Sequence, residues 1–145
     1  MRRFAPVYIA AALALIDGAA KYLANQWLPE ISGSHFSLFE ISLYKNFGII
    51  FSLPIASTVS ILMSFVIIVG LIVYLTIKKP AHEITNAIIC IELGAIGNLV
   101  DRILNGYVTD YLVFFHRSAI NLSDILIVTG IFCFLWYARK NGQKN

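Results

Sequence analysis

Four long apolar stretches constrain the fold of this chain more than any other feature of its sequence. They cover residues 4–23, 55–77, 84–104 and 119–138. A helix needs about 20 mainly apolar residues to cross a bilayer, and each stretch reaches that length. Only 13% of the 145 residues are charged, against about 25% in soluble domains. The sequence therefore predicts a mainly α membrane protein with four transmembrane helices, forming one integral membrane domain over residues 1–145.

The distribution of cations predicts how these helices cross the membrane. Lys and Arg are enriched in cytoplasmic segments. Here they precede the first stretch, join the second to the third and follow the fourth, as Arg2, Arg3, Lys78, Lys79, Arg139, Lys140 and Lys144. Four crossings place all of them on one side, so we expect both termini in the cytoplasm and the loops 24–54 and 105–120 outside. If the first stretch were instead a cleaved signal peptide, the remaining spans would no longer fit this rule.

Composition also argues against several classes of function. Cys90 and Cys133 both lie inside apolar stretches, which provides neither a disulfide framework nor a zinc motif. The net charge of +3 is small and scattered, so nucleic-acid binding is not expected. In the outer loops, apolar and polar residues alternate over residues 39–43, and residues 111–115 are rich in β-forming side chains. We expect these two segments to pair into a small extracytoplasmic β-sheet resting on the membrane surface.

Polar side chains that interrupt or flank the apolar stretches gather toward the predicted outer face. Ionisable groups inside a span are costly and are functional candidates by default. In the predicted topology, the following groups lie near the outer interface: Asp17, Lys21, Asn98, Asp101, Arg102, Asp110, Asn121 and Asp124. Glu92, in the middle of the third stretch, is the exception, and no role is assigned to it.

The helical spacing of these groups also offers purely structural explanations. Asp17 and Lys21 are i,i+4 partners on one helix face and can neutralise each other. Asn98 lies within about one turn of both Asp101 and Arg102, so bonds among them could stitch neighbouring helices together. On this interpretation Asp101 holds Asn98 and Arg102 in place, and Asp17 acts mainly through Lys21.

The third and fourth stretches carry their own packing and capping signals. Gly94 and Gly97 lie on one helical stripe and allow a neighbouring helix to approach closely. Asn121 can cap the fourth helix, which places Asp124 in its first turn, where a carboxylate is favoured. The sequence shows no metal motif, no Ser-His-Asp set and no reactive cysteine at the outer interface. A pair of carboxylates is therefore the one credible catalytic constellation.

Five motifs occur in an order that matches a known family. They are Asp17-x-x-x-Lys21, Asn46-x-Gly48-x-x-Phe51, Gly94-Ala95-x-Gly97-Asn98-x-x-Asp101-Arg102, Gly106-x-Val108-x-Asp110 and Asn121-x-x-Asp124. On these motifs, and on the number of spans, the chain resembles the lipoprotein signal peptidases (signal peptidase II) of bacteria. Leu93, Ile49 and Ile50 depart from the usual pattern of that family by being bulkier than the residues common there. None of these departures removes a catalytic group.

The resemblance implies a membrane aspartyl endopeptidase that cleaves diacylglyceryl-modified prolipoproteins just before the lipidated cysteine. It makes Asp110 and Asp124 the catalytic pair. It gives supporting or substrate-binding roles to Asn46, Asn98, Asp101, Arg102, Asn121, Asp17 and Lys21. It also implies a small β-cradle, no metal or cofactor, and prolipoproteins and membrane lipid as partners. We expect a monomer in the bacterial cytoplasmic (inner) membrane, with its active site at the outer face.

Two other functions stay open on the residues alone. A small transporter or proton-conducting helical bundle would use Glu92 as its ion site. Such a protein needs polar residues along a path through the bilayer, and residues 55–77 are almost free of them. A non-catalytic relative would bind lipoproteins without cutting them, which the presence of both Asp110 and Asp124 disfavours.

Overall fold

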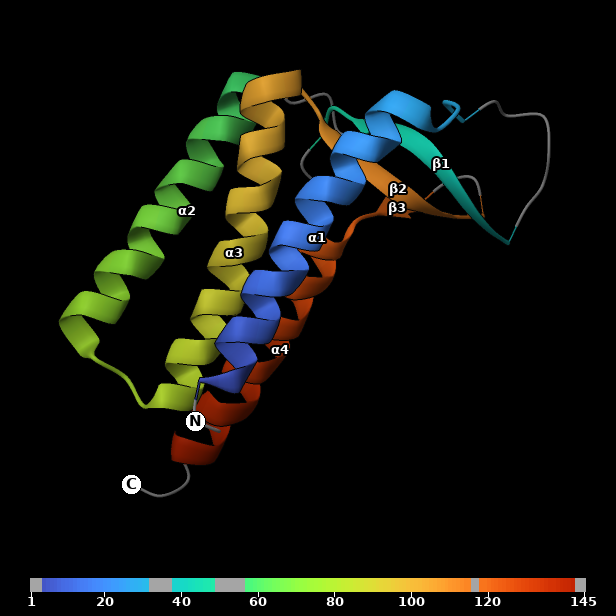
Figure 1. Ribbon diagram of the computed structural model, residues 1–145. Coiled ribbons are helices and arrows are strands. Elements are labelled where there is room, and N and C mark those ends of the chain that lie inside the picture. The colour runs from blue at the N-terminus through green and yellow to red at the C-terminus, as the bar shows by residue number, and fades with distance from the viewer. Residues whose placement is uncertain (1–3, 32–37, 49–56, 116–117, 143–145) are drawn as a thin grey trace.

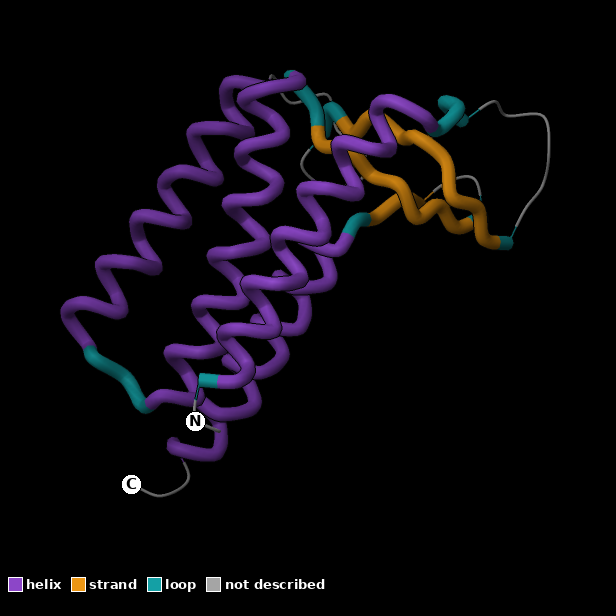
Figure 2. Tube along the Cα trace, in the orientation of Figure 1, coloured by secondary structure: helices purple, strands orange, loops and turns teal. Residues whose placement is uncertain are grey.

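The computed structural model describes residues 4–31, 38–48, 57–115 and 118–142. Its four helices are α1 (Ala5–Trp27), α2 (Ser57–Lys78), α3 (His82–Asn105) and α4 (Leu122–Gly142). α3 packs against the other three helices, most extensively against α4. A small sheet lies at the end of the bundle where α1 ends and α4 begins, and the α2–α3 connection lies at the opposite end (Figure 1). The tube view separates these two parts, the helical bundle and the sheet beside its end (Figure 2).

Among the described residues, three helical segments are long and apolar enough to cross a membrane: Ala5–Trp27, Thr58–Lys78 and Leu122–Lys140. Large apolar side chains on α1, α2 and α4 are exposed, as expected for surfaces that face lipid rather than water. α3 has the length of a span but carries more charge, including Glu83, Glu92, Asp101 and Arg102. Three of the four predicted spans are thus supported by length and composition, while the crossing by α3 stays a prediction.

The helix ends differ from the predicted spans most clearly at the fourth helix. The sequence predicts a span that starts at residue 119, whereas α4 begins at Leu122. The difference arises because Ser118–Ile120 form strand β3, so the apolar residues there belong to the sheet. The first helix continues past residue 23 to Trp27. The start of the second predicted span, at residues 55–56, lies outside the described residues, as do the cations Arg2, Arg3 and Lys144.

The sheet confirms the expectation of a small β structure. It is antiparallel in the order β1-β2-β3, with β1 spanning Phe39–Asn46 and β2 spanning Val108–Phe114. The central strand, β2, is buried along most of its length because β1 and β3 flank it and the bundle packs against it. Gly106, with a φ of 80°, ends α3 in the left-handed conformation that glycine favours. This turn leads the chain directly from α3 into β2.

Glycines set the closest approach of α3 and α4. A Cβ atom on Gly94 would collide with the carbonyl oxygen of Ser123, and one on Gly130 would lie 2.7 Å from the carbonyl oxygen of Ala87. A Cβ atom on Gly97 would collide with the Ser123 hydroxyl. The close approach predicted at Gly94 and Gly97 is therefore confirmed. Gly130 makes the matching contact from α4, which the sequence did not indicate.

Gly130→Ala is expected to lower the stability of the protein in detergent by about 1–3 kcal/mol, because the added methyl group meets the backbone of α3. Gly70→Ala on α2 is the matched control, since a Cβ there meets nothing within 4 Å. Thermal unfolding of both variants in the same detergent measures the difference. Equal Tm values for the two variants would contradict the close contact at Gly130.

Candidate active site

Asp110 and Asp124 meet around a single asparagine at the junction of sheet and bundle. Asp110 lies in the middle of β2 and is fully buried, and Asp124 lies in the first turn of α4 and is partly exposed. The Asn121 side chain donates through Nδ2 to Asp110 Oδ1 at 2.6 Å. The Asn121 backbone N–H donates to Asp124 Oδ2 at 3.3 Å. The two residues that the resemblance makes catalytic are thus bound to the same residue.

Asn121 also caps the start of α4, as the sequence predicts. Its Oδ1 accepts the backbone N–H of Asp124 at 2.9 Å, while the Asp124 carboxylate accepts the backbone N–H of Asn121. This reciprocal arrangement is a capping box, which satisfies two backbone donors at the start of a helix. The side-chain oxygen of Asn121 is used by the cap, so its amide group is left to bind Asp110.

The surroundings of Asp110 favour its protonated form. Asn46, on the neighbouring strand β1, donates through Nδ2 to Asp110 Oδ2 at 3.0 Å, and its own Oδ1 accepts the Gly48 N–H at 3.1 Å. Burial, followed by the negative charge of Asp124, raises the pKa of Asp110 to about 7. The hydrogen bonds from asparagines and the charge of Lys21 act in the opposite direction. Near neutral pH this carboxyl group can therefore either hold or release a proton.

Lys21 orients the amide that binds Asp124. Its Nζ donates to Asn98 Oδ1 at 2.7 Å and lies 3.1 Å from Asp17 Oδ2 and 3.8 Å from Asp101 Oδ2. With its oxygen held by an ammonium group, Asn98 turns its Nδ2 toward Asp124, to whose Oδ1 it donates at 2.8 Å. A buried chain of contacts thus runs from α1 through α3 to the first turn of α4.

Asp101 has more contacts than the sequence predicts. It interacts electrostatically with Arg102, and it lies 3.8 Å from Lys21 Nζ, which itself binds Asn98. It also accepts the backbone N–H of Thr109 at 2.5 Å and the Thr109 hydroxyl at 3.1 Å. Because Thr109 directly precedes Asp110 in β2, Asp101 fixes the strand beside the candidate catalytic residue.

Asp17 binds several groups besides Lys21. This corrects the expectation that Asp17 acts mainly through its pairing with Lys21. It also accepts hydrogen bonds from the Tyr111 hydroxyl, the Leu122 backbone N–H and the Ser123 hydroxyl. Thr109, Tyr111 and Ser123 are parts of the site that no sequence motif indicated. Their one local signal is that each is a hydroxyl residue directly next to Asp110 or Asp124.

Arg102 and Asn25 complete the polar surroundings. Arg102 is partly exposed, and its guanidinium interacts electrostatically with Asp101, Asp110 and Asp124. Asn25, which no sequence motif indicated, donates to the Thr109 hydroxyl at 2.8 Å. In the described ranges, no cluster of three or more His, Cys, Asp or Glu side chains could hold a metal ion.

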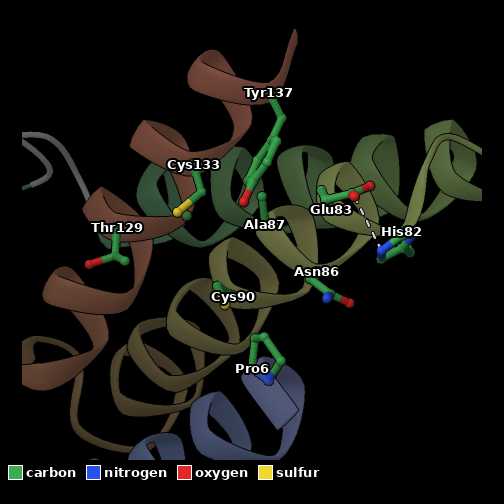
Figure 3. A pocket seen from close by; sticks show the side chains of 10 residues that line it. Pro6, His82, Glu83, Asn86, Ala87, Cys90, Thr129, Cys133 and Tyr137 are labelled. Carbon is green, nitrogen blue, oxygen red and sulfur yellow. Dashed lines mark ion pairs between the residues drawn. The ribbon is translucent and has the colours of Figure 1, made fainter. Parts of the chain in front are cut away.

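The described part of the bundle contains a cavity that adjoins the candidate site and another that does not. One of about 300 Å³ lies between α1 and α3, and Lys21, Asn25 and Asp101 are among its lining residues. The other, of about 270 Å³, is lined by residues of α3 and α4, including Cys90 and Cys133, with a contribution from the start of α1 (Figure 3). None of the predicted site residues lines the cavity of about 270 Å³. The cavity of about 300 Å³ lies directly against the polar network of the candidate site.

Three comparisons with known proteins agree. The family model for signal peptidase (SPase) II matches residues 9–140. A lipoprotein signal peptidase of Caldanaerobacter subterraneus subsp. tengcongensis is 32% identical over 130 residues, which cover 86% of this chain and 88% of that protein. One of Francisella tularensis subsp. novicida is 35% identical over 132 residues, 79% of each chain.

The fold is also shared with solved structures. A structure described as a bacterial membrane enzyme has a TM-score of 0.78 and 22% sequence identity to this chain, and the match covers 97% of this chain and 90% of that one. At this identity the match shows the fold. Taken with the family model and the two relatives, it leads to one conclusion: the chain belongs to the signal peptidase II family.

Proposed function

We propose that this chain is a membrane aspartyl endopeptidase that removes the signal peptide from diacylglyceryl-modified prolipoproteins, cleaving just before the lipidated cysteine. Membership of the signal peptidase II family makes it a bacterial membrane protease, and its named relatives are lipoprotein signal peptidases. The observation that carries the aspartyl mechanism is the binding of Asp110 and Asp124 to the same residue, Asn121. These two aspartates are the proposed catalytic pair.

The proposed mechanism uses one proton shared by the pair. Two neighbouring carboxylates do not easily both ionise, so one stays protonated near neutral pH. The ionised carboxylate takes a proton from a water molecule, whose oxygen attacks the scissile carbonyl carbon. The protonated carboxyl donates a hydrogen bond to the carbonyl oxygen. When the tetrahedral intermediate collapses, the C–N bond breaks and a carboxyl proton passes to the leaving amine.

The position of the pair suits a lipid-anchored substrate. Asp110 and Asp124 lie at the end of the bundle that carries the sheet, which the cation distribution assigns to the outer face of the membrane. A diacylated cysteine would be held there by its acyl chains, so that its peptide bond is presented to the pair. Arg102, a cation beside both carboxylates, is suited to bind a substrate carbonyl group. We assign the enzyme to the inner membrane, and we expect it to act as a monomer.

The direct test is incubation of the purified full-length protein with a diacylglyceryl-modified prolipoprotein. Mass spectrometry should detect a mature product whose first residue is the lipidated cysteine, together with the released signal peptide. A substrate that binds but stays intact would instead support a non-catalytic lipoprotein-binding relative.

The proposed topology has four spans, including α3, with both termini in the cytoplasm. Lys78 ends α2 and Arg139 and Lys140 lie in the last turn of α4, all at the end of the bundle away from the sheet. Reporter fusions after Asn145 and within residues 32–34 should therefore report opposite sides of the membrane. Both fusion sites lie outside the described residues. The same side for both reporters would contradict the four-span arrangement.

The raised pKa of Asp110 predicts how pH affects both activity and stability. Cleavage should fall as pH rises above about 7, because the pair then loses its shared proton. An unfolded aspartate has a pKa of about 3.9, so the folded state holds this proton more tightly. The resulting stabilisation is complete below about pH 4 and is lost as pH rises through about 7. As pH rises from about 4 to about 7, the Tm of the wild type should fall relative to the Tm of Asp110→Asn. A Tm difference that does not change with pH would contradict the raised pKa of Asp110.

A further inference from the structure

Asp17 on α1 collects hydrogen bonds from β2 and from the start of α4. Its Oδ1 accepts the Tyr111 hydroxyl at 2.8 Å and the Leu122 backbone N–H at 3.0 Å. Its Oδ2 accepts the Ser123 hydroxyl at 2.6 Å. Three segments that are far apart in the sequence are therefore joined by one carboxylate.

The two hydroxyl donors are direct sequence neighbours of the proposed catalytic residues. Tyr111 follows Asp110 in β2, where successive side chains point to opposite faces of the strand. Ser123 precedes Asp124 in the first turn of α4. The Asp17 carboxylate thus ties β2 to α4 immediately beside the two aspartates, whereas Asn121 ties the same elements by binding the aspartates themselves.

This cluster is closed to solvent. The exposed fractions are 1% for Asp17, 7% for Tyr111 and 0% for Ser123. Hydrogen bonds to a buried carboxylate are strong, and removal of a donor leaves a buried acceptor that water cannot easily reach. The Leu122 N–H is also one of the backbone donors that a helix leaves unpaired at its start, so Asp17 supplies a cap from another helix.

We propose that Asp17, Tyr111 and Ser123 form a positioning clamp that sets the distance between β2 and the first turn of α4, and thereby the separation of Asp110 and Asp124. The inference rests on the proposed function, because it treats these two aspartates as the catalytic pair. The clamp residues act through the pair and do not themselves react with substrate.

The separation of the pair should determine how tightly its proton is held. Burial and the charge of Asp124 both raise the pKa of Asp110. A wider pair weakens the repulsion between charges and admits water, and both changes lower that pKa. Among the described residues, the other titratable or charged groups that interact with Asp110, pair with it across the sheet or contact its charged partners include Asp17 and Lys21 on α1, Tyr44 on β1, Asp101 and Arg102 on α3, and Tyr111 on β2.

The test uses Tyr111→Phe, Ser123→Ala and the double variant, which remove the donor hydroxyls and little else. Tyr8→Phe and Ser64→Ala are matched controls, because Tyr8 is 70% exposed and the Ser64 hydroxyl donates to the backbone carbonyl of Ser60 in its own helix. Cleavage of a diacylglyceryl-modified prolipoprotein is measured from pH 5 to 9, at a temperature below every Tm, with pH steps of about half a unit so that the shift expected below is resolved.

For the double variant we expect kcat to fall by about 10- to 100-fold with little change in KM. The alkaline limb of its pH profile should move to lower pH by about half a unit, as expected for a pair separated by about 1 Å more. A lower Tm with an unchanged pH profile, whether or not kcat falls, would reduce the cluster to a structural role and overturn the clamp. The proposed function would survive that result if Asp110→Asn is inactive. Turnover by Asp110→Asn would overturn both proposals.

Discussion

Asp110→Asn and Asp124→Asn should each abolish cleavage while leaving a folded protein that still binds substrate. Asparagine keeps the size of the side chain and one acceptor oxygen, but it cannot share the proton that the mechanism needs. We expect the rate to fall by at least about 10⁴-fold, as for other catalytic groups that act as a unit. Because the two carboxylates work together, the double variant should be scarcely slower than either single variant. Product formation is measured with a diacylglyceryl-modified prolipoprotein, and binding by co-purification.

The matched control is Glu92→Gln, which makes the same change from carboxylate to amide on α3. Glu92 Oε1 is buried and has no hydrogen-bond partner among the described residues, so cleavage should be unchanged. Asp101→Asn should lower Tm at least as clearly as activity, because Asp101 holds the strand through Thr109. Substantial turnover by either Asp110→Asn or Asp124→Asn would show that the pair has been assigned incorrectly. Loss of cleavage in Glu92→Gln would show that Glu92 takes part in the reaction, contrary to this expectation.

Lipidation of the substrate should raise the cleavage rate by at least about 100-fold. The proposed pair lies at the end of a bundle whose outer surfaces are apolar. Acyl chains in the adjoining leaflet would confine the scissile bond to this interface and supply much of the positioning that a chain of this size cannot provide through contacts with the peptide.

The measurement compares a diacylglyceryl-modified prolipoprotein with its unmodified precursor at the same concentration in the same vesicles. A precursor whose cysteine is replaced by serine is the matched control, because it keeps the signal peptide and cannot be lipidated. Both unlipidated substrates should be cut at the same low rate. If all three substrates were cut equally fast, lipid anchoring would have no part in recognition, although the aspartyl mechanism would still stand.

Local sequence patterns predicted much of the fold and the identity of the polar residues. The apolar stretches predicted the helices. A period of two over residues 39–43 and the β-forming side chains of residues 111–115 predicted the paired strands. Asn121 and Asp124 were expected to cap α4, and Gly94 to allow close packing, since these effects act within one turn or through backbone size. The start of α4 was placed too early because apolar residues in β3 look like a continuation of the span.

The partners of the polar residues were decided by the tertiary structure. Asn98 was expected to bind within its own helix, yet it contacts Lys21, 77 residues away. The partners of Asp17 include Tyr111 and Ser123, which are 94 and 106 residues away. A sequence motif lists groups that can donate or accept, but each buried carboxylate takes its donors from whichever elements the packing brings within reach. The sequence by itself thus determined the helices, the small sheet and most of the polar residues of the site. Only the packing of α1, α3 and α4 against one another and against the sheet decided which of these residues bind one another.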